Sequence, residues 1–347
     1  MINIWKIIII IIFIGINVEN YYIDDSNENI KHILKKITIL KEFNKIFSNL
    51  YFLAKEGKTK GPSYHKNSAI NKYTIIKKQG LCLCTLGKRE NLYIREFIEY
   101  YHLLGFEKII IFDNNDINDE KIDYLLNDYI RKKFVEIIDI RGIRSAQIPS
   151  FNYCYKKYNQ LYDWIAFFDF DEFLFINNYI YNKRFENCQT ILFNWYFYDD
   201  NNLEKYDGRK NIERFKHPKK KTIKVKSMVR GNIKNLIIPA SMILGINIDY
   251  FCNPNGIRIY PINFYSSPFQ KDYKIFIKHF YTKTAEEFCN KINKGDVQFH
   301  KGQYLYNSII NGKIKLFFSI NKITIGKIKI LEKCLGLNLN NYRKNLK

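Results

Sequence analysis

The chain has 347 residues, 46% of them hydrophobic and 16% aromatic, so it can bury a large core and is not an intrinsically disordered protein. Its 56 lysines and arginines exceed its 34 aspartates and glutamates, which gives a formal net charge of +22. Such a charge raises the question of nucleic-acid binding. However, no zinc-finger, basic-zipper or RNA-recognition pattern occurs, so nucleic acid is not an expected partner.

Residues 1–20 are predicted to form an N-terminal hydrophobic anchor. Residues 7–18 are almost all apolar, with Lys6 before them and Glu19 after them. A bilayer span needs roughly 20 residues, which residues 1–20 supply if Lys6 extends to the headgroups. Lys6 predicts a cytoplasmic N-terminus and a translocated remainder, hence a single-pass membrane protein of the secretory pathway if the source is eukaryotic. A cleaved signal peptide is the alternative, although no typical cleavage site follows.

The rest of the chain divides by composition into three parts. Residues 21–79 are polar and charged, and we interpret them as a stem that contains the linker-like segment GKTKGPSYHKNS. Residues 80–300 are expected to form the main domain, and residues 301–347 a C-terminal tail.

From Gly80 onward, short apolar strands alternate with amphipathic helices. The strands are expected at 81–86, 108–112, 134–138 and 164–168, and the helices at 90–104, 119–131 and 146–159. This alternation predicts an α/β domain with a mostly parallel sheet and helices on both faces. In such sheets, ligands bind beyond the carboxyl ends of the strands.

Carboxylates interrupt an apolar run at one such strand end, in the segment WIAFFDFDEFLFI from Trp164 to Ile176. Asp169, Asp171 and Glu172 would cost several kcal/mol each to bury in ionised form unless something pairs with them. Two carboxylates at a strand end suit a divalent cation with oxygen ligands, Mn²⁺ or Mg²⁺, which would supply the countercharge. The alternative is that the two carboxylates accept hydrogen bonds from backbone N–H groups.

The seven cysteines form no C-x-x-C pair. We interpret most of them as small buried hydrophobic residues. One disulfide, such as Cys188 with Cys252, is the alternative, because the sequence alone does not pair cysteines.

Four segments together resemble the family 92 and family-2-like glycosyltransferases. They are TLGKREN-x-YIREFIEYYHLLGFEKIIIFDNND, FVEIIDIRG, YDWIAFFDFDEF and, later, IKHFYTKTAEEFCNKINKGD. They occur in the family's order over residues 80–296. The resemblance implies a GT-A-type fold that binds a nucleotide sugar, in which an Asp-x-Asp motif holds Mn²⁺ or Mg²⁺ against the donor's diphosphate.

The resemblance also implies roles for particular residues. Asp169 and Asp171 match the metal motif, and His279 matches a late histidine that completes the metal shell. Lys283 stands where it could hold a phosphate oxygen. The nucleotide's base and ribose would lie near the ends of the first two strands, against Thr85, Lys88, Glu90, Asp113 and Asn115.

An inverting transfer would need a carboxylate base for the acceptor hydroxyl. Asp199 and Asp200, in WYFYDDNN, are the candidates. Family members tend to have a glycine-containing turn after Trp195, which this chain lacks, so the assignment stays open. Glu172 is the other candidate, although its position indicates a packing or supporting role.

Two further features allow a structural and a functional interpretation. Trp195 and Tyr196 could stack on an acceptor sugar or pack in the core. The basic run of residues 216–226 is typical of a solvated loop, and its functional alternative is contact with a membrane surface or an acidic acceptor.

The function expected is metal-dependent transfer of a sugar from a nucleotide-sugar donor, above all a UDP-sugar, to a hydroxyl of a glycan or glycoconjugate. Galactose is suggested by analogy with family 92 alone. A haloacid-dehalogenase-like phosphatase is one alternative, but such enzymes usually have threonine or valine where this chain has Phe173. A membrane-anchored, non-catalytic glycan-binding protein is the other, and the intact Asp169, Asp171 and His279 argue against it.

Overall fold

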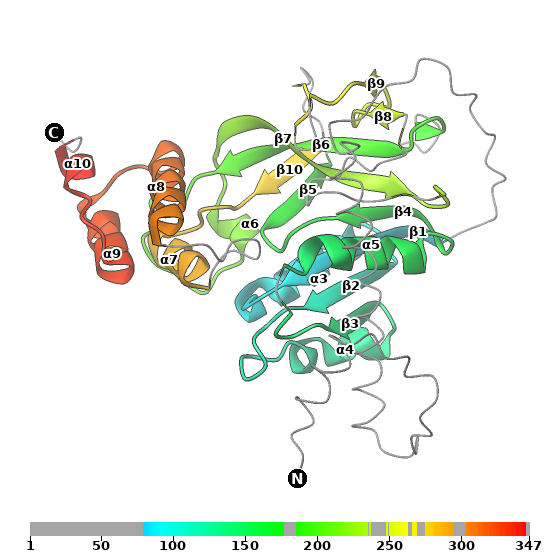
Figure 1. The fold of residues 1–347 in the computed structure, drawn as a ribbon, viewed down its shortest axis with the longest axis horizontal. Coiled ribbons are helices and arrows are strands. Elements are labelled where there is room, and N and C mark those ends of the chain that lie inside the picture. The colour runs from blue at the N-terminus through cyan, green and yellow to red at the C-terminus, as the bar shows by residue number, and fades with distance from the viewer. Residues whose placement is uncertain are drawn as a thin grey trace, which may run out of the picture. The chain divides into compact units, whose positions relative to one another are not determined.

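Figure 1 shows the computed structural model of the chain. It describes residues 79–344 apart from residues 144, 177–184, 235, 237–247, 249, 263–265, 269–274 and 295–302. The expected anchor and the stem up to residue 78 therefore lie outside the described residues. Among the helices that are described, none is long and apolar enough to cross a membrane.

One half of the central sheet is parallel, as expected. Its strands are β1 (Gln79–Gly87), β2 (Lys108–Asp113), β3 (Val135–Asp139) and β4 (Tyr162–Phe167), in the order β3-β2-β1-β4. The apolar runs that predicted them are buried, and the side chains from Ile109 to Phe112 are fully inaccessible. The four strands are thereby confirmed, with small shifts at their ends.

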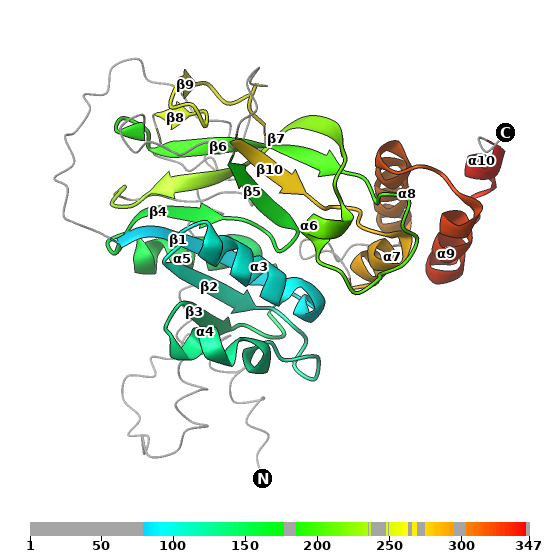
Figure 2. The same cartoon turned by 180° about the vertical axis from the view of Figure 1, so that it is seen from behind.

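Two helices cover opposite faces of this parallel half. Figures 1 and 2 show α3 (Asn91–Leu103) on one face and α5 (Gln147–Tyr158) on the other. The apolar face of α3 buries Ile94, Phe97, Ile98 and Tyr101.

The expected helix over residues 119–131 is wrong in its first part. The chain forms a 3₁₀ turn, η2 (Asp123–Leu126), and then the short helix α4 (Asn127–Arg131). Asp119 accepts a hydrogen bond from Arg89, and Glu120 accepts one from the backbone N–H of Asn91 at 3.1 Å. These two side chains hold residues 119–122 against the start of α3, in place of a regular helical turn.

The other half of the sheet is not mostly parallel, which corrects the expectation. Strand β7 (Pro218–Arg230) runs antiparallel to both β4 and β6 (Thr190–Tyr198). Strand β10 (Ile275–His279) is parallel to β6, and β5 (Glu172–Ile176) is antiparallel to β10. Two short strands, β8 (Phe251–Cys252) and β9 (Arg258–Ile259), extend from β6. The fold is thus mixed α/β, because β7 runs antiparallel to both of its neighbours and β5 runs antiparallel to β10.

Helices follow β10 and lie beyond its end (Figure 1). They are α7 (Ala285–Asn293), α8 (Gln303–Ile320), α9 (Ile325–Leu335) and α10 (Asn340–Arg343). Apolar side chains from α7, α8 and α9 form one buried cluster that includes Phe288, Phe317 and Leu331. Each fully buried side chain of this kind contributes about 1.5–3 kcal/mol. The described part of the expected tail is therefore a packed group of helices.

Six of the seven cysteines are paired. Cys188–Cys252, which the sequence left as an alternative, is confirmed and joins the segment before β6 to β8. Cys84–Cys154 links β1 to α5, and Cys289–Cys334 links α7 to α9. Cys82 is free and buried, so the interpretation as a small hydrophobic residue holds for it and is wrong for the six paired cysteines.

These pairings predict one thiol per chain after denaturation without a reductant, and seven after reduction. Such disulfides persist in proteins made in an oxidising compartment, so the chain is best produced by secretion for this measurement. A colorimetric thiol titration in denaturant reads out the count. Seven thiols before reduction would contradict the pairings.

Candidate functional site

The carboxylates lie in the turn between β4 and β5. Phe170, between the two aspartates, packs against Phe97 of α3 with ring centroids 4.8 Å apart. It also lies over Gly87 at the end of β1, where a Cβ atom would come within 2.5 Å of the Phe170 ring. Gly87 therefore lets the turn approach β1 closely and places Asp169 and Asp171 beyond the carboxyl ends of the parallel strands.

Strand β10 brings His279 to these acids. In the antiparallel pairing of β10 with β5, His279 stands opposite Glu172. Its Nε2 lies 3.4 Å from Asp171 Oδ1 and 4.0 Å from Glu172 Oε1. Asp171, Glu172 and His279 are the one group among the described residues whose potential ligand atoms could hold a metal, all within 4.8 Å of one another. His279 is thus where the sequence expectation requires it, and its role as a ligand stays a prediction.

Burial sets the protonation of these groups. Burial lowers the pKa of His279, so its imidazole is neutral at neutral pH, the form that binds metal ions. Burial opposes ionisation of Asp171, but Lys291 and His279 hold its pKa well below the ordinary value. Burial raises the pKa of Glu172 well above its ordinary value, and its Oε1 has no hydrogen-bond partner among the described residues.

Two lysines compensate the buried acids. Lys226, on β7, is itself buried, and its Nζ lies 2.8 Å from Asp169 Oδ2 and 3.4 Å from Glu172 Oε2. Lys291, on α7, lies 2.6 Å from Asp171 Oδ2. Asp169 also accepts a hydrogen bond from Gln147 at 3.2 Å, and it does not belong to the group of three. Its role as a metal ligand stays a prediction.

Sequence reasoning missed both lysines. Lys226 had one available signal, since it stands beside apolar residues in the part of β7 that is buried. Lys291 lies within the last family-like segment, on a helix whose start is marked by the Thr284–Glu287 capping box. Neither signal identifies the acid that each lysine contacts.

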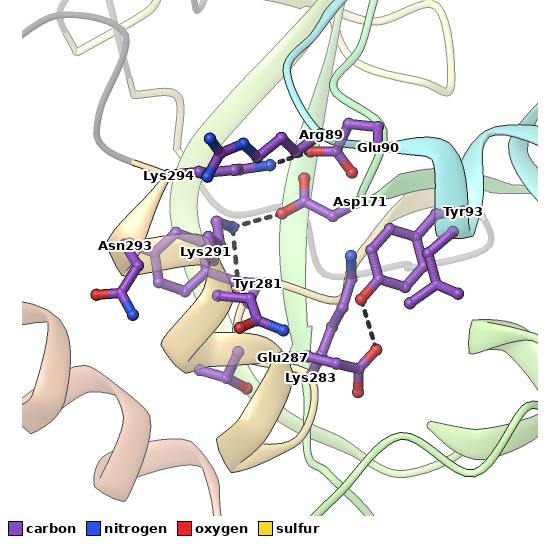
Figure 3. A pocket seen from close by; sticks show the side chains of 13 residues that line it. Arg89, Glu90, Tyr93, Asp171, Tyr281, Lys283, Glu287, Lys291, Asn293 and Lys294 are labelled. Carbon is purple, nitrogen blue, oxygen red and sulfur yellow. Dashed lines mark hydrogen bonds and ion pairs between the residues drawn. The ribbon is translucent and has the colours of Figure 1, made fainter. Parts of the chain in front are cut away.

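A cavity of about 330 Å³ lies beside Asp171, between the start of α3 and helix α7 (Figure 3). Its lining includes four cations: Arg89, Lys283, Lys291 and Lys294. Three of them contact carboxylates, since Arg89 pairs with Asp119, Lys291 with Asp171, and Lys294 with Glu90. Lys283, the expected phosphate ligand, instead lies over the ring of Tyr93, with its Nζ 3.2 Å from the centroid. Burial lowers the pKa of Lys283 to about 8.

Most of the expected nucleotide contacts lie at the neighbouring ends of β1 and β2. Gly87 pairs with Asp113 in the sheet, so the loops that carry Lys88, Glu90 and Asn115 adjoin. Asn115 accepts a hydrogen bond from the backbone of Arg89 at 2.6 Å. The nucleotide contacts of Lys88, Glu90, Asp113 and Asn115 stay predictions.

Thr85 was expected to contact the nucleotide but is fully buried, and Arg141 was not expected at this edge. Thr85 lies within β1, fully buried, and its Oγ1 has no hydrogen-bond partner among the described residues. Its nucleotide contact also stays a prediction. Arg141, which sequence reasoning missed, lies with its Nε 3.9 Å from Asp113 Oδ2, where burial raises the pKa of Asp113.

The two candidate bases follow β6 and differ in environment. Asp199 keeps some exposure, and its carboxylate lies 3.3 Å from the Nζ of Lys219. Asp200 is buried, 2.6 Å from the Nζ of the equally buried Lys327 on α9. Burial raises the pKa of Asp200 to about 6. Asp200 thus ties β6 to α9, and Asp199 is the more accessible of the two; the base itself stays a prediction.

The two features with alternative interpretations are also placed. Trp195 and Tyr196 are buried, and Trp195 packs against the His279 ring with centroids 4.4 Å apart, which supports the core-packing interpretation. In the basic run, residues 216–221 are exposed, but the loop interpretation is wrong, because Pro218–Arg230 forms β7 and Lys226 is buried.

The sequence profile described as Glycosyltransferase family 92 matches residues 77–250, about half of the chain. The chain belongs to glycosyltransferase family 92. The matched segment contains the β4–β5 turn with its acids, while His279, Lys283 and Lys291 lie after its end.

Plant members of family 92 are among its curated relatives. A family 92 protein of Oryza sativa subsp. japonica is 28% identical over 104 residues, 30% of this chain and 18% of that protein. One of Ricinus communis is 30% identical over 97 residues, 28% of this chain and 17% of that protein. The similarity therefore spans less than a fifth of the length of these relatives.

Solved structures of lower similarity include S. aureus TarS and one mannosyltransferase. S. aureus TarS is 10% identical over 78% of this chain and 49% of its own, with a TM-score of 0.33. The mannosyltransferase PcManGT of Pyrobaculum calidifontis, solved with GDP-Man and Mn²⁺, is 8% identical over 46% of each chain, with a TM-score of 0.24. At these scores neither structure defines the fold of this chain.

The Asp200–Lys327 pair generates a prediction. Lys327→Met should lower the free energy of unfolding by about 3–5 kcal/mol, because it leaves a buried carboxylate without a countercharge. Lys327→Met combined with Asp200→Leu should recover most of this loss, since both charges are then gone. Denaturant unfolding at pH 7.5 measures the differences.

Lys329→Met serves as the control, because Lys329 is an exposed lysine of the same helix. If the Lys327 and Lys329 variants unfold alike, Asp200 and Lys327 do not form the buried ion pair.

Proposed function

We propose that the chain is a metal-dependent glycosyltransferase of the GT-A type, which moves a hexosyl group from a nucleotide-sugar donor to a hydroxyl of a glycan or glycoconjugate. The observation that carries this proposal is the convergence of Asp171, Glu172 and His279 in a chain of family 92. The family-like segment YDWIAFFDFDEF contains the two acids, and the last family-like segment, which begins at Ile277, contains the histidine. A phosphatase does not fit membership of this family.

The cavity next to Asp171 supports a diphosphate-containing donor. A nucleoside diphosphate needs cations where its phosphates lie. Lys283 faces the cavity without a carboxylate in ion-pair distance among the described residues, so its charge is available to a phosphate oxygen. The loops after β1 and β2, with Lys88, Glu90 and Asn115, would then contact the nucleoside. We propose a UDP-sugar as the donor.

The residues present fit a divalent cation. Two carboxylates and an imidazole form a ligand set suited to Mn²⁺, and Mg²⁺ accepts the same oxygen ligands. Glu172 Oε1 is a buried carboxylate oxygen with no hydrogen-bond partner among the described residues, as expected of an atom reserved for an ion. Asp171, Glu172 and His279 would hold the ion. When bound, it would neutralise the charge that develops on the departing diphosphate.

The other residues of the site bind and orient. Lys226 holds Asp169, and Lys291 holds Asp171, so the turn keeps its shape while the donor binds.

For inversion, the acceptor hydroxyl must lose its proton to a carboxylate as it attacks the anomeric carbon. Asp199 is the accessible candidate, and its neighbours Lys219 and His217 keep it near the exposed basic run.

We further propose that residues 1–20 anchor the protein in a membrane of the secretory pathway, with the transferase domain on the luminal side. The apolar run after Lys6 supports the anchor. The three disulfides support an oxidising compartment for the domain.

The metal site predicts the behaviour of Asp171→Asn. The purified chain should hydrolyse a member of a nucleotide-sugar panel slowly, with Mn²⁺ and not with EDTA. Asp171→Asn should reduce this rate by about 100-fold or more, since removal of even supporting residues around a metal costs roughly 10- to 100-fold. Asp171→Asn and Asp169→Asn should both abolish sugar transfer to an acceptor, because both acids shape the turn.

Electron paramagnetic resonance of Mn²⁺ provides a second readout that does not depend on activity. Asp171→Asn and His279→Ala should weaken Mn²⁺ binding, whereas Asp128→Asn, at an exposed acid of α4, should not. A chain that binds Mn²⁺ and nucleotide sugars but turns none over would support the non-catalytic alternative. Wild-type Mn²⁺ affinity in Asp171→Asn would contradict the site.

A further inference from the structure

Lys283 has an unusual backbone and side-chain environment. Its φ of 49° lies in the left-handed region, which non-glycine residues adopt rarely. Only 8% of the residue is accessible, although it carries an ammonium group. Such backbone strain persists only where the surrounding structure enforces it, and it is concentrated at ligand clamps and active sites.

Glu287, in the first turn of α7, holds the residue that follows Lys283. Its Oε2 accepts hydrogen bonds from the Thr284 Oγ1 at 2.7 Å and the Thr284 N–H at 3.2 Å. Thr284 caps α7 and directly follows Lys283, so this capping box fixes the chain where Lys283 turns into the helix.

The same carboxylate also fixes the ring beneath Lys283. Tyr93, on α3, donates its hydroxyl to Glu287 Oε1 at 2.8 Å, as the dashed line in Figure 3 shows. Lys283 Nζ lies over this ring, which attracts the ammonium. Glu287 therefore contacts both the residue that follows Lys283 and the tyrosine on whose ring the Lys283 ammonium lies.

A buried arginine holds Glu287 in turn. Arg214, on the short helix α6 (Asn211–Arg214), is fully inaccessible and bonds both carboxylate oxygens, at 2.7 Å and 2.8 Å. Although burial favours the neutral acid, Arg214 holds the pKa of Glu287 below its ordinary value, so the carboxylate is charged. Glu96 of α3 accepts hydrogen bonds from the N–H groups of Asn211 and Ile212, which fixes α6 to α3.

We propose that Glu287, with Arg214 and Tyr93, forms a positioning triad that holds the Lys283 ammonium in the cavity beside Asp171, ready for a phosphate oxygen of the donor. This inference rests on the proposed nucleotide-sugar site and adds the residues that orient its cation. The triad joins α3, α6 and α7, so the lysine is placed by tertiary structure and not by its own rotamer preference.

The mildest test is Tyr93→Phe, which keeps the ring and the Arg214–Glu287 pair and removes one hydrogen bond. The dissociation constants of UDP and of GDP, each with Mn²⁺, are measured by calorimetry on the full chain. For the nucleotide that binds, we expect Tyr93→Phe to weaken binding about three- to tenfold, the range of one buried hydrogen bond. Tyr100→Phe is the matched control, because it removes a hydroxyl bond to the Leu174 carbonyl from the same helix and should not change nucleotide binding.

A double-mutant cycle distinguishes positioning from a general structural role. In the background of Lys283→Met, which itself weakens binding, Tyr93→Phe should have no further effect, because it acts through Lys283. Thermal unfolding confirms that each variant is folded.

If the wild-type chain binds UDP or GDP, the proposed function stands. Two results would then contradict this inference alone. One is unchanged nucleotide affinity in Tyr93→Phe, and the other is an undiminished effect of Tyr93→Phe when Lys283 is absent. A wild-type chain that binds neither nucleotide would contradict the proposed function, and this inference with it.

Discussion

The arrangement of the site depends on the burial of negative charge at the end of β4. Glu172 is inaccessible and the Asp171 side chain is 13% exposed, and an unpaired charge in such a place costs several kcal/mol. The lysines that compensate them are Lys226 of β7 and Lys291 of α7, and His279 of β10 contacts both acids. The mixed half of the sheet and helix α7 must therefore fold onto the parallel half before the acids are satisfied.

Helix α7 extends this constraint to the C-terminal helices. It carries Lys291 and Glu287, and Lys283 directly precedes its cap. The disulfide Cys289–Cys334 and a shared apolar cluster fix the same helix to α9. The three lysines of the cavity thus depend on helices that follow the family-matched segment in the sequence. Changes in α8 and α9 are expected to affect donor binding through α7.

The sequence predicted the parts of the structure that local patterns determine. The apolar runs mark β1 to β4, and the Asp-x-Asp interruption marks the end of the last. It did not predict the mixed sheet, because the pairing of β7 with β4 and β6 is a long-range contact without a local signal. The helix expected from Asp119 failed because side chains there bind the start of α3.

Within the site, residue type and contact were predictable to different degrees. His279 and Lys283 were found through a resemblance that spans the whole domain, because the motif includes them. Lys226 and Arg214 resemble ordinary surface cations in the sequence, and only the fold shows them fully buried against Glu172 and Glu287. A buried ion pair between elements this far apart leaves no periodic pattern in either partner.

The central claim is that Asp171, Glu172 and His279 hold a divalent cation next to the cavity proposed for the donor. Anomalous X-ray scattering from crystals of the chain grown with Mn²⁺ and UDP tests it most directly. The account predicts one strong manganese peak in contact with the Asp171 carboxylate and the His279 imidazole, with the diphosphate on the side of Lys283. A manganese peak elsewhere, or UDP bound in the cavity without manganese, would contradict it.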